Sequence, residues 1–328
     1  MSEKYVIGID LGGTNTVIGL VDVKGHILAK DDSIKTQAHP DIEEYTDSIA
    51  AVIKRLAEEN GCEGKLEGVG VGAPMANYYT GEIVNAANLP WKGIVPLGWL
   101  IEKKTGLPTK VTNDANAAAI GEMKYGVAQG MKDFVYITLG TGVGSGIVAN
   151  GQLIYGHDGF AGELGHVTAP VLEGRACGCG RTDCLEPYAS ATGIVRTAKK
   201  WLVERDTPSS LRDICMNNLT SKMLFDAAMA GDEFAKEIFD FTGKVLGDAF
   251  CNFIAFSAPE AIILFGGLAN AGDYILRPTY KHMEENQLGV FKGKVKLLMS
   301  GIQDKNVAIL GGAALIWKQH LEAVIGNY

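Results

Sequence analysis

The sequence lacks the features of membrane proteins and of nucleic-acid-binding proteins. No apolar run reaches 18 residues, and no basic segment followed by a short apolar stretch opens the chain, so neither a transmembrane helix nor a secretory leader is expected. Basic residues are few, with 30 Lys and Arg against 38 Asp and Glu and a net charge of −8. Binding to a phosphate backbone requires clustered Lys and Arg. We therefore expect a cytoplasmic protein without nucleic-acid or membrane partners.

Two common phosphate-binding loops are also absent. Asp10-Leu-Gly-Gly-Thr-Asn15 follows a short apolar run, residues 5–9, but it has neither the Lys of a Walker A loop nor the G-x-G-x-x-G spacing. Strands are predicted at 16–21 and, after a turn at Lys24-Gly25, at 26–35. A Gly-rich turn between two strands can offer backbone N–H groups to phosphate oxygens. The alternative is a hairpin turn without a ligand.

The same pattern recurs at an offset of 128 residues. Residues 135–142 match residues 7–14, and Asn150-Gly151 repeats the second turn. A duplicated hairpin with a Gly-rich turn predicts two related α/β domains facing one cleft. The second copy has Thr138 where the first has Asp10, so only Asp10 could orient Mg²⁺ through water.

One His and three of the six Cys lie in a single segment, as His166, Cys177, Cys179 and Cys184. Three thiolates and one imidazole suit a closed tetrahedral zinc site. Buried free thiols or a disulfide are the alternatives, although Cys177 and Cys179 are too close in sequence to pair comfortably. Because four protein ligands leave no position for a bound water, we expect a structural zinc, one ion per chain.

Two acidic residues flank this segment. Glu163 precedes His166 by three residues, so that a helical turn would place both on one face, and Glu186 comes two residues after Cys184. The metal would hold Glu163, His166 and Glu186 in a fixed relation. Convergent acceptors of this kind suit a ligand rich in hydroxyl groups. The segment predicts a polar small-molecule pocket.

Between the two copies, apolar periodicity predicts a core helix over residues 42–56 and a strand over 66–71 that ends at Gly72-Ala-Pro74. Asn88-Leu-Pro90 lies in a long loop with few apolar anchors, and such loops are often functional. A strand at 110–112 leads to Asn113-Asp-Ala-Asn116, which opens a helix over 117–125 closed by Gly126. Asp114 at this helix start is either an N-cap or a proton acceptor that the helix dipole keeps ionised.

The last third of the sequence predicts mainly core elements. Helices are expected at 194–202 and 234–256, the second with an aromatic stripe that belongs to the core. A buried strand at 261–265 ends at Gly266-Gly267, where the backbone could approach a flat ring or ribose. One more strand is expected at 292–300. Gly311-Gly312 is expected to open a final helix over 313–325 that packs back on a domain.

These motifs together resemble those of the ROK family of sugar kinases, repressors and open reading frames, nearly from end to end. The motifs that carry the resemblance are Asp10-Leu-Gly-Gly-Thr, Gly72-Ala-Pro, Asn88-Leu-Pro, Asn113-Asp-Ala-Asn, Leu139-Gly-Thr-Gly-Val-Gly, Gly162-Glu-Leu-Gly-His and the Cys cluster ending at Glu186. Asp183 departs from the family, which usually has Gly before the final Cys. The turn there is expected to be strained or differently hydrogen-bonded, with metal binding retained.

The resemblance implies an α/β fold of the actin-like, hexokinase-like (ribonuclease H-like) type with an interdomain cleft. The N-terminal α/β domain would comprise residues 1–112, with a C-terminal helix at about 306–328 packing back on it. The larger α/β domain, residues 113–305, would carry the zinc segment. ATP and Mg²⁺ are the expected cofactors besides zinc.

The resemblance also implies roles for individual residues. Asp114 would be the general base toward the 6-hydroxyl of a sugar. The sugar contacts would be Gly72, Asn88, Asn113, Asp114, Glu163, His166 and Glu186, with His166 using its other nitrogen on zinc. The nucleotide contacts would be Asp10, Gly12, Gly13, Thr14, Gly140, Thr141 and Gly142 at the phosphates and Gly266 and Gly267 near the adenosine.

The expected function is ATP-dependent phosphorylation of a hexose, with glucose as the first choice and N-acetylmannosamine or fructose as alternatives. A non-catalytic sugar sensor or repressor is a second class, although the first strand begins at residue 5, leaving no room for a helix-turn-helix. An ATPase of the actin or Hsp70 type is a third class, in which the Cys-rich segment would have no purpose. A homodimer is expected from the resemblance and from the prevalence of two-fold oligomers.

Overall fold

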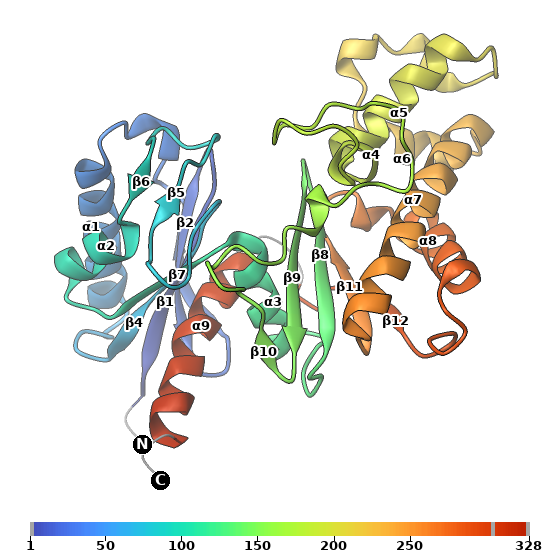
Figure 1. The fold of residues 1–328 in the computed structure, drawn as a ribbon. Helices are drawn as coiled ribbons and strands as arrows, with labels where there is room; N and C mark the ends of the chain where they lie inside the picture. The colour runs from blue at the N-terminus through green and yellow to red at the C-terminus, as the bar shows by residue number, and fades with distance from the viewer. Residues whose placement is uncertain (1–2, 303–305, 326–328) are drawn as a thin grey trace. The chain divides into compact units, whose positions relative to one another are not determined.

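The structure is a computed structural model that describes residues 3–302 and 306–325. The chain divides into two compact units, each built around a sheet of its own (Figure 1). Unit 1 comprises Met1–Met131, Leu153–Gly162 and Ser300–Tyr328, and unit 2 comprises Lys132–Gln152 and Glu163–Met299. In the described part of the chain, no helix combines the length and the apolar character needed to cross a membrane.

The sheet of unit 1 has the strand order β3-β2-β1-β4-β7. The first three strands form antiparallel pairs, whereas β1, β4 and β7 run parallel. The strands are β1 (Tyr5–Leu11), β2 (Thr16–Asp22), β3 (Ile27–Asp31), β4 (Leu66–Gly72) and β7 (Thr109–Thr112), with a separate pair, β5 (Ile83–Val84) and β6 (Ile94–Val95). The helices are η1 (Thr36–Ala38, 3₁₀), α1 (Ile42–Glu59), α2 (Leu97–Thr105), α3 (Asp114–Tyr125) and α9 (Asn306–Ile325). The third strand is shorter than the predicted 26–35.

Glycine alternates with branched apolar residues on the central strands of unit 1. Ile7 and Ile9 of β1 join the core beneath α1, whereas Gly8 and Gly70 point the other way, toward α9. A Cβ on Gly8 would lie 2.0 Å from the carbonyl oxygen of Ile309, and one on Gly70 would lie 1.9 Å from that of Gly312. Only glycine lets the α9 backbone lie directly on the strands. In unit 1, α1 and α2 thus cover one face of the sheet and α9 the other (Figure 1).

The start of the last helix predicted from Gly311-Gly312 is wrong, whereas the start at about residue 306 implied by the resemblance agrees with the structure. Gly311 and Gly312 lie inside α9, which begins at Asn306. A Cβ on Gly311 would lie 2.2 Å from the carbonyl oxygen of Ala117, and one on Gly312 would lie 2.4 Å from that of Gly70. Close packing against a helix and a strand therefore requires glycine here. Each glycine costs about 1 kcal/mol of helix stability relative to alanine.

The division into units also differs from the predicted boundary after residue 112. Helix α3 belongs to unit 1 because it packs tightly on α9, where a Cβ on Gly121 would lie 3.1 Å from the backbone nitrogen of Gly311. Leu153–Gly162 belongs to unit 1 as well, and its Asp158 carbonyl accepts a hydrogen bond of 2.6 Å from Asn77 Nδ2. Residues 326–328 of the expected C-terminal helix lie outside the described residues.

Unit 2 repeats the topology of unit 1, with the strand order β10-β9-β8-β11-β12. A β8–β9 hairpin is antiparallel, and β8, β11 and β12 run parallel. The strands are β8 (Phe134–Leu139), β9 (Val143–Ala149), β10 (Gln152–Leu153), β11 (Ala261–Phe265) and β12 (Lys296–Met299). The helices are η2 (Leu164–His166), α4 (Glu186–Ala189), α5 (Ala191–Glu204), η3 (Ser210–Asp213), η4 (Met216–Asn218), α6 (Ser221–Met229), α7 (Glu233–Ser257), η5 (Ala269–Ala271) and α8 (Asp273–Asn286), where η marks a 3₁₀-helix. The predicted duplication is confirmed.

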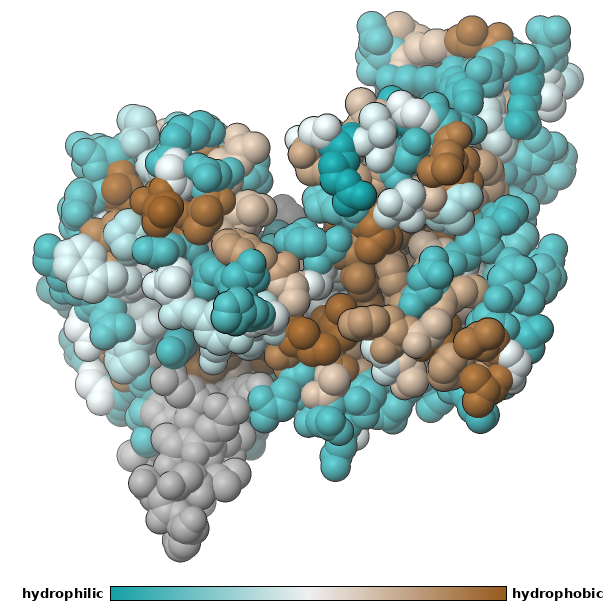
Figure 2. All heavy atoms as spheres, in the orientation of Figure 1, coloured by the Kyte–Doolittle hydropathy of each residue, from teal (hydrophilic) through white to brown (hydrophobic). Residues whose placement is uncertain are grey.

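Two predictions for unit 2 are wrong in detail. Strand β12 begins at Lys296, because residues 292–295 form turns. The aromatic stripe of α7 is not entirely core: Phe234 and Phe253 are buried, but Phe256 is 80% exposed. Figure 2 shows that hydrophobic residues also lie among hydrophilic ones on the face of the molecule that it draws. Phe256 lies in the last turn of the helix, where the packed partners of the stripe end.

Candidate functional site

In unit 1, three predicted site residues lie at one edge of the sheet. Asp10 of β1 is in register with Gly72 of β4, and Gly72 is in register with Thr112 of β7. Asp114 follows β7 by two residues and begins α3. A Cβ on Gly72 would lie 3.5 Å from Asp114 Cα. Because β1, β4 and β7 run parallel, their carboxyl ends bring Asp10, Gly72 and Asp114 together at the position where open α/β sheets commonly bind ligands.

The cap of α3 is Asn113, not Asp114. Asn113 Oδ1 accepts a hydrogen bond of 2.9 Å from the backbone N–H of Ala115, and Asp114 Oδ1 shares the same donor at 2.8 Å. Asp114 is accessible to solvent, yet the protein atoms around its carboxyl desolvate it. This desolvation raises its pKa above the ordinary value of 3.8, while backbone hydrogen bonds from Ala115 and Asp114 oppose the shift. A solvent-accessible carboxylate with a raised pKa can act as a proton acceptor.

The loop that carries Asn88 lies against the first Gly-rich turn. It is better anchored than predicted, because Ala86, Leu89 and Trp91 are all buried. Asn88 itself is exposed. A Cβ on Gly13 would lie only 3.1 Å from Asn88 Nδ2. In unit 1, the predicted phosphate turn and the predicted sugar loop are therefore immediate neighbours.

The first turn is held by a short network of hydrogen bonds. The N–H of Gly12 donates to the carbonyl of Asn15 at 3.0 Å. The hydroxyl of Thr36 donates to the carbonyl of Gly12 at 2.8 Å, and the N–H of Thr36 donates to the carbonyl of Thr14 at 3.0 Å. Thr14 and Asn15 are exposed. The turn is thus fixed from behind, with its tip accessible to a ligand.

The second Gly-rich turn, in unit 2, is closed by a different side chain. The hydroxyl of Thr138 accepts a hydrogen bond of 3.0 Å from the N–H of Gly144. From outside the turn, the hydroxyl of Thr192 donates to the carbonyl of Thr141 at 2.7 Å. Gly266 has a φ of 106° and packs on the strand that enters the turn, where a Cβ would lie 2.7 Å from the carbonyl oxygen of Leu139. Gly140–142 and Gly266-Gly267, all predicted nucleotide contacts, are therefore neighbours in unit 2.

Glu163, His166 and Glu186 gather around Val143, at the start of β9. Glu186 Oε2 accepts a hydrogen bond of 3.0 Å from the N–H of Val143. Glu163 directly precedes the 3₁₀ turn η2, which ends with His166, and the N–H of His166 donates a hydrogen bond of 3.0 Å to the carbonyl of Glu163. In the middle of that turn, a Cβ on Gly165 would lie 2.1 Å from the carbonyl oxygen of Val143. The predicted sugar contacts of unit 2 therefore lie close together.

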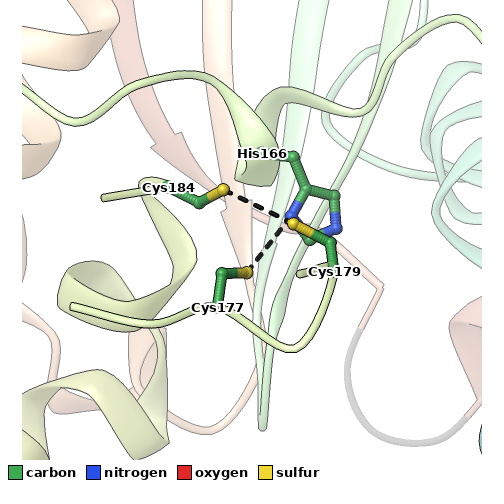
Figure 3. Close-up of side chains that lie close together, drawn as sticks. All are labelled: His166, Cys177, Cys179 and Cys184. Atoms are coloured by element: carbon green, nitrogen blue, oxygen red, sulfur yellow. Dashed lines mark hydrogen bonds between the residues drawn. The ribbon is translucent and has the colours of Figure 1, made fainter. Parts of the chain in front are cut away.

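His166, Cys177, Cys179 and Cys184 form a compact cluster, shown in Figure 3. Their ligand atoms all lie within 4.8 Å of one another. Cys177 Sγ lies 3.6 Å from His166 Nδ1, and Cys179 Sγ lies 3.6 Å from Cys184 Sγ. All six cysteines of the chain are free thiols, so the disulfide alternative is wrong. The second ring nitrogen of His166 points away from the sulfur atoms in Figure 3.

The spacing within the cluster suits a metal ion. Around tetrahedral zinc, with Zn–S of about 2.3 Å and Zn–N of about 2.0 Å, neighbouring sulfur atoms lie about 3.8 Å apart and sulfur lies about 3.5 Å from nitrogen. Burial raises the pKa of the Cys177 thiol to about 12. Adjacent thiolates in such surroundings are stable only with a cation between them. The donor set therefore fits a divalent metal ion.

The residue before the last Cys holds the loop in shape. Asp183 has a φ of 55°, in the left-handed region. Its carboxylate accepts hydrogen bonds from the N–H groups of Gly174 and Arg175, at 3.1 and 2.9 Å, and from the hydroxyl of Tyr188. The expectation of a strained or differently hydrogen-bonded turn is confirmed by the left-handed φ of Asp183, and its side-chain hydrogen bonds offset the backbone strain.

Sequence reasoning missed several residues that shape the site. Thr192 and Ser145 hold the second turn and η2, where Ser145 Oγ accepts a hydrogen bond of 3.0 Å from the N–H of Leu164. Gln37 bonds to both the first turn and the Asn88 loop. None of these residues belongs to a local motif, because each acts through a contact with a residue at least 19 positions away.

Comparisons with known proteins agree on one family. The model of the ROK family matches residues 6–320. The chain is 38% identical to a glucokinase of Halalkalibacterium halodurans over 100% of this chain and 99% of that protein. It is 34% identical to a glucokinase of Thermotoga maritima over 96% of this chain and 98% of that protein.

A solved structure gives the same result. The crystal structure of a ROK family glucokinase from Streptomyces griseus in complex with glucose and AMPPNP has a TM-score of 0.77 to this chain, with 33% identity, and the match covers 96% of this chain and 99% of that one. This supports the expected actin-like, hexokinase-like α/β fold. From the family model and the full-length relatives together, the chain belongs to the ROK family.

Proposed function

We propose that this protein is an ATP-dependent hexose kinase that transfers the γ-phosphoryl group of ATP to the 6-hydroxyl of glucose. The observation that carries the proposal is the position of Asp114, an accessible carboxylate with a raised pKa at the carboxyl edge of the parallel strands, beside Gly72. The full-length similarity to glucokinases of two bacteria supports glucose as the substrate.

The chemistry follows from what phosphoryl transfer needs. Asp114 accepts the proton of the attacking hydroxyl, a contribution on the order of 10²–10⁴-fold for a general base. The remaining work is alignment of the hydroxyl with the γ-phosphate, neutralisation of charge and exclusion of water. Mg²⁺ would supply the neutralisation, and the carboxylate of Asp10, at the same sheet edge, would orient it through water.

Each unit carries polar side chains that suit a sugar. Unit 1 supplies Asn88 and Asn113, and unit 2 supplies Glu163, His166 and Glu186. Carboxylates accept hydrogen bonds from hydroxyl groups, amides can donate and accept, and the second nitrogen of His166 remains available when Nδ1 faces the cluster. Each set thus offers donors and acceptors of the kind that the hydroxyl groups of a hexose require.

The Gly-rich turn of each unit suits the phosphate groups of ATP. Gly12, Gly13 and Thr14 in unit 1 and Gly140, Thr141 and Gly142 in unit 2 would contact phosphates through backbone N–H groups. Gly266 and Gly267 would lie near the adenosine, where the absence of side chains lets a flat ring approach the backbone. The close packing of Gly266 on the second turn supports a continuous nucleotide surface in unit 2.

The cluster of His166, Cys177, Cys179 and Cys184 would hold one structural Zn²⁺. Four protein ligands complete a tetrahedral shell, so the ion would brace the loop without taking part in phosphoryl transfer. Bracing would fix His166 and, through Cys177, the neighbourhood of Glu186, whose Oε1 lies 3.7 Å from Cys177 Sγ.

We propose two further properties, a homodimer and a cytoplasmic location. A homodimer agrees with the prevalence of two-fold oligomers, and sedimentation at the mass of a single chain would count against it. A cytoplasmic location agrees with the use of ATP and with free thiols.

Initial rates with ATP across a panel of hexoses test the function directly. We expect glucose to give the highest kcat/KM and the product to be glucose 6-phosphate. Faster turnover of N-acetylmannosamine or fructose would change the assigned substrate but leave the assigned reaction, ATP-dependent phosphorylation of a hexose, unchanged. Binding of a hexose without phosphorylation of any would overturn the kinase and favour a sugar sensor.

A further inference from the structure

A single side chain in unit 1 bonds to both the first Gly-rich turn and the loop that carries Asn88. Gln37 Nε2 lies 2.6 Å from the carbonyl oxygen of Gly13 and 2.9 Å from the carbonyl oxygen of Asn88. Both partners are acceptors, so the two protons of the amide group must face them, and this assigns the orientation of the side chain.

The region behind Gln37 is a buried scaffold. The hydroxyl of Thr36 donates to the carbonyl of Gly12, and Thr16 Oγ1 lies 3.0 Å from Thr36 Oγ1 and 2.6 Å from the hydroxyl oxygen of Tyr45. Since Thr36 donates its proton to Gly12, it must accept from Thr16, and Thr16 then accepts from Tyr45. This chain of hydroxyl groups fixes one end of η1, on which Gln37 lies.

The same scaffold also supports the Asn88 loop. The ring of Tyr45 lies against that of Trp91, with centroids 4.5 Å apart, and Trp91 Nε1 donates a hydrogen bond of 3.0 Å to the carbonyl of His39. Trp91 lies three residues after Asn88. The segment around Gln37 is therefore fixed between the two loops, and Gln37 itself, exposed at the surface, supplies the direct bond between them.

We propose that Gln37 is a positioning residue that couples nucleotide binding to sugar binding in unit 1. The inference rests on the proposed function, in which Gly13 contacts phosphate and Asn88 contacts sugar. A phosphate that orders the turn would hold the carbonyl of Gly13 in place, and through Gln37 this would hold the backbone of Asn88. Binding of either ligand would then order the loop that contacts the other ligand and raise the affinity for it. This is positive coupling, of equal size in both directions.

The test measures binding instead of turnover. The affinity of the wild type for glucose is determined by calorimetry with and without a non-hydrolysable ATP analogue, and the ratio is the coupling factor. Gln37→Leu keeps a similar volume and removes both donors. We expect the coupling factor to fall by roughly two- to tenfold, the range of one to two hydrogen bonds. The affinity for either ligand alone should change less.

Three further variants separate coupling from damage to the fold. Gln37→Glu places carboxylate oxygens against two carbonyls and should reduce the coupling at least as much as Gln37→Leu. Gln37→Lys restores a group with several donor protons and should recover part of the coupling. Gln129→Leu is the matched control, because Gln129 is an exposed residue that donates to a single carbonyl, that of Lys124.

Several results would overturn the inference. These are a wild-type coupling factor of one, a Gln37→Leu variant whose coupling equals that of Gln129→Leu, or a loss of affinity for each ligand alone with the coupling unchanged. The proposed function is judged separately, by turnover of the wild type. A protein that binds both ligands and transfers no phosphoryl group would refute the kinase, while the coupling factor would still decide the role of Gln37.

Discussion

Unit 1 and unit 2 share a five-stranded topology but use it differently. The strand that enters the first turn has Asp10 one residue before its end, whereas its counterpart in unit 2 has Thr138, whose hydroxyl accepts a hydrogen bond from the N–H of Gly144. Unit 1 adds a second carboxylate, Asp114, at the same sheet edge. Unit 2 adds a metal-binding loop and Glu186, which reaches its turn from α4. The repeat supplies two similar Gly-rich turns. The functional groups differ between the units: carboxylates in unit 1, and a metal-binding loop with Glu186 in unit 2.

The two units also differ in where glycine allows close packing. In unit 1, Gly8 and Gly70 on the strands let the α9 backbone approach the sheet. In unit 2, Gly243 and Gly247 on α7 let α8 approach instead, where a Cβ on Gly247 would lie 2.6 Å from the carbonyl oxygen of Thr279. The two sheets therefore have the same strand order, but the glycines that allow close helix packing lie on the strands in unit 1 and on a helix in unit 2.

The largest expected effect concerns the carboxylate that only unit 1 supplies. Asp114→Asn keeps the shape and can still meet a hydroxyl group, but it cannot accept the proton. We expect kcat to fall by roughly two to four orders of magnitude, while the affinity for glucose changes far less. Steady-state kinetics and calorimetry of the variant measure both.

A matched change elsewhere in unit 1 serves as the control. Asp41 caps α1, accepting a hydrogen bond of 2.7 Å from the N–H of Glu43, and Asn caps helices about as well as Asp. Asp41→Asn should therefore leave kcat unchanged. An Asp114→Asn variant with near wild-type kcat would refute the catalytic assignment.

The second effect concerns the feature that only unit 2 carries. Cys179→Ser removes one ligand of a site of the kind that binds zinc with about 10–16 kcal/mol in small peptides. We expect loss of stoichiometric zinc by metal analysis and a weaker affinity for sugar, with a smaller change in nucleotide affinity. Cys215→Ser, at an exposed cysteine outside the cluster, should alter neither. Purified wild type without zinc would contradict the proposal.

The third effect tests the close packing of unit 1. Gly70→Ala would place a Cβ 1.9 Å from the carbonyl oxygen of Gly312. Because both partners are backbone, the helix must move, and we expect the free energy of unfolding to fall by about 1–3 kcal/mol or more. Gly289→Ala, where a Cβ meets nothing within 4 Å, is the control for thermal unfolding. Equal melting temperatures would contradict this account of the α9 face.

These features differ in how far the sequence predicts them. The metal ligands lie within 19 residues and the Gly-rich turns within five, so their local spacing is enough to predict them. Gly311 and Gly312 were misinterpreted as a helix start because their purpose is a tertiary contact with Ala117 and Gly70. Gln37 carries no local signal at all, since its partners are 24 and 51 residues away. Local chemistry is predictable here, and long-range packing is not.

The fourth effect is a shift of the pH profile. Desolvation raises the pKa of Asp114, so the carboxylate becomes protonated, and inactive as a base, at a higher pH than an ordinary Asp. As the pH falls through this raised pKa, kcat/KM should decline, with the acidic limb above 3.8. Because the folded state disfavours the charged form of Asp114, the free energy of unfolding should also decrease as the pH rises from the ordinary pKa of an Asp through the raised one. An acidic limb at or below the ordinary value would contradict the assignment.

The smallest expected effect lies in the loop that distinguishes unit 2. At Asp183, with a φ of 55°, Asp183→Gly relieves the left-handed backbone but loses the side-chain bonds to Gly174, Arg175 and Tyr188, whereas Asp183→Ala loses the bonds and keeps the strain. We expect the melting temperatures to rank wild type, then Gly, then Ala, with Gly and Ala about 2–4 °C apart. Both variants should keep the metal, because all four ligands remain.

The pH dependence of that ranking gives a second readout. The pKa of Asp183 is lowered, mainly by the hydrogen bond from the hydroxyl of Tyr188. The stabilisation by the Asp183 carboxylate is therefore present above the ordinary pKa of an Asp and is lost as the pH falls through the lowered pKa. The gap between wild type and Asp183→Gly should therefore narrow at acid pH, while the gap between Gly and Ala, which is backbone strain, should not. If Asp183→Ala melts at or above Asp183→Gly, the strained turn does not limit the stability of the loop.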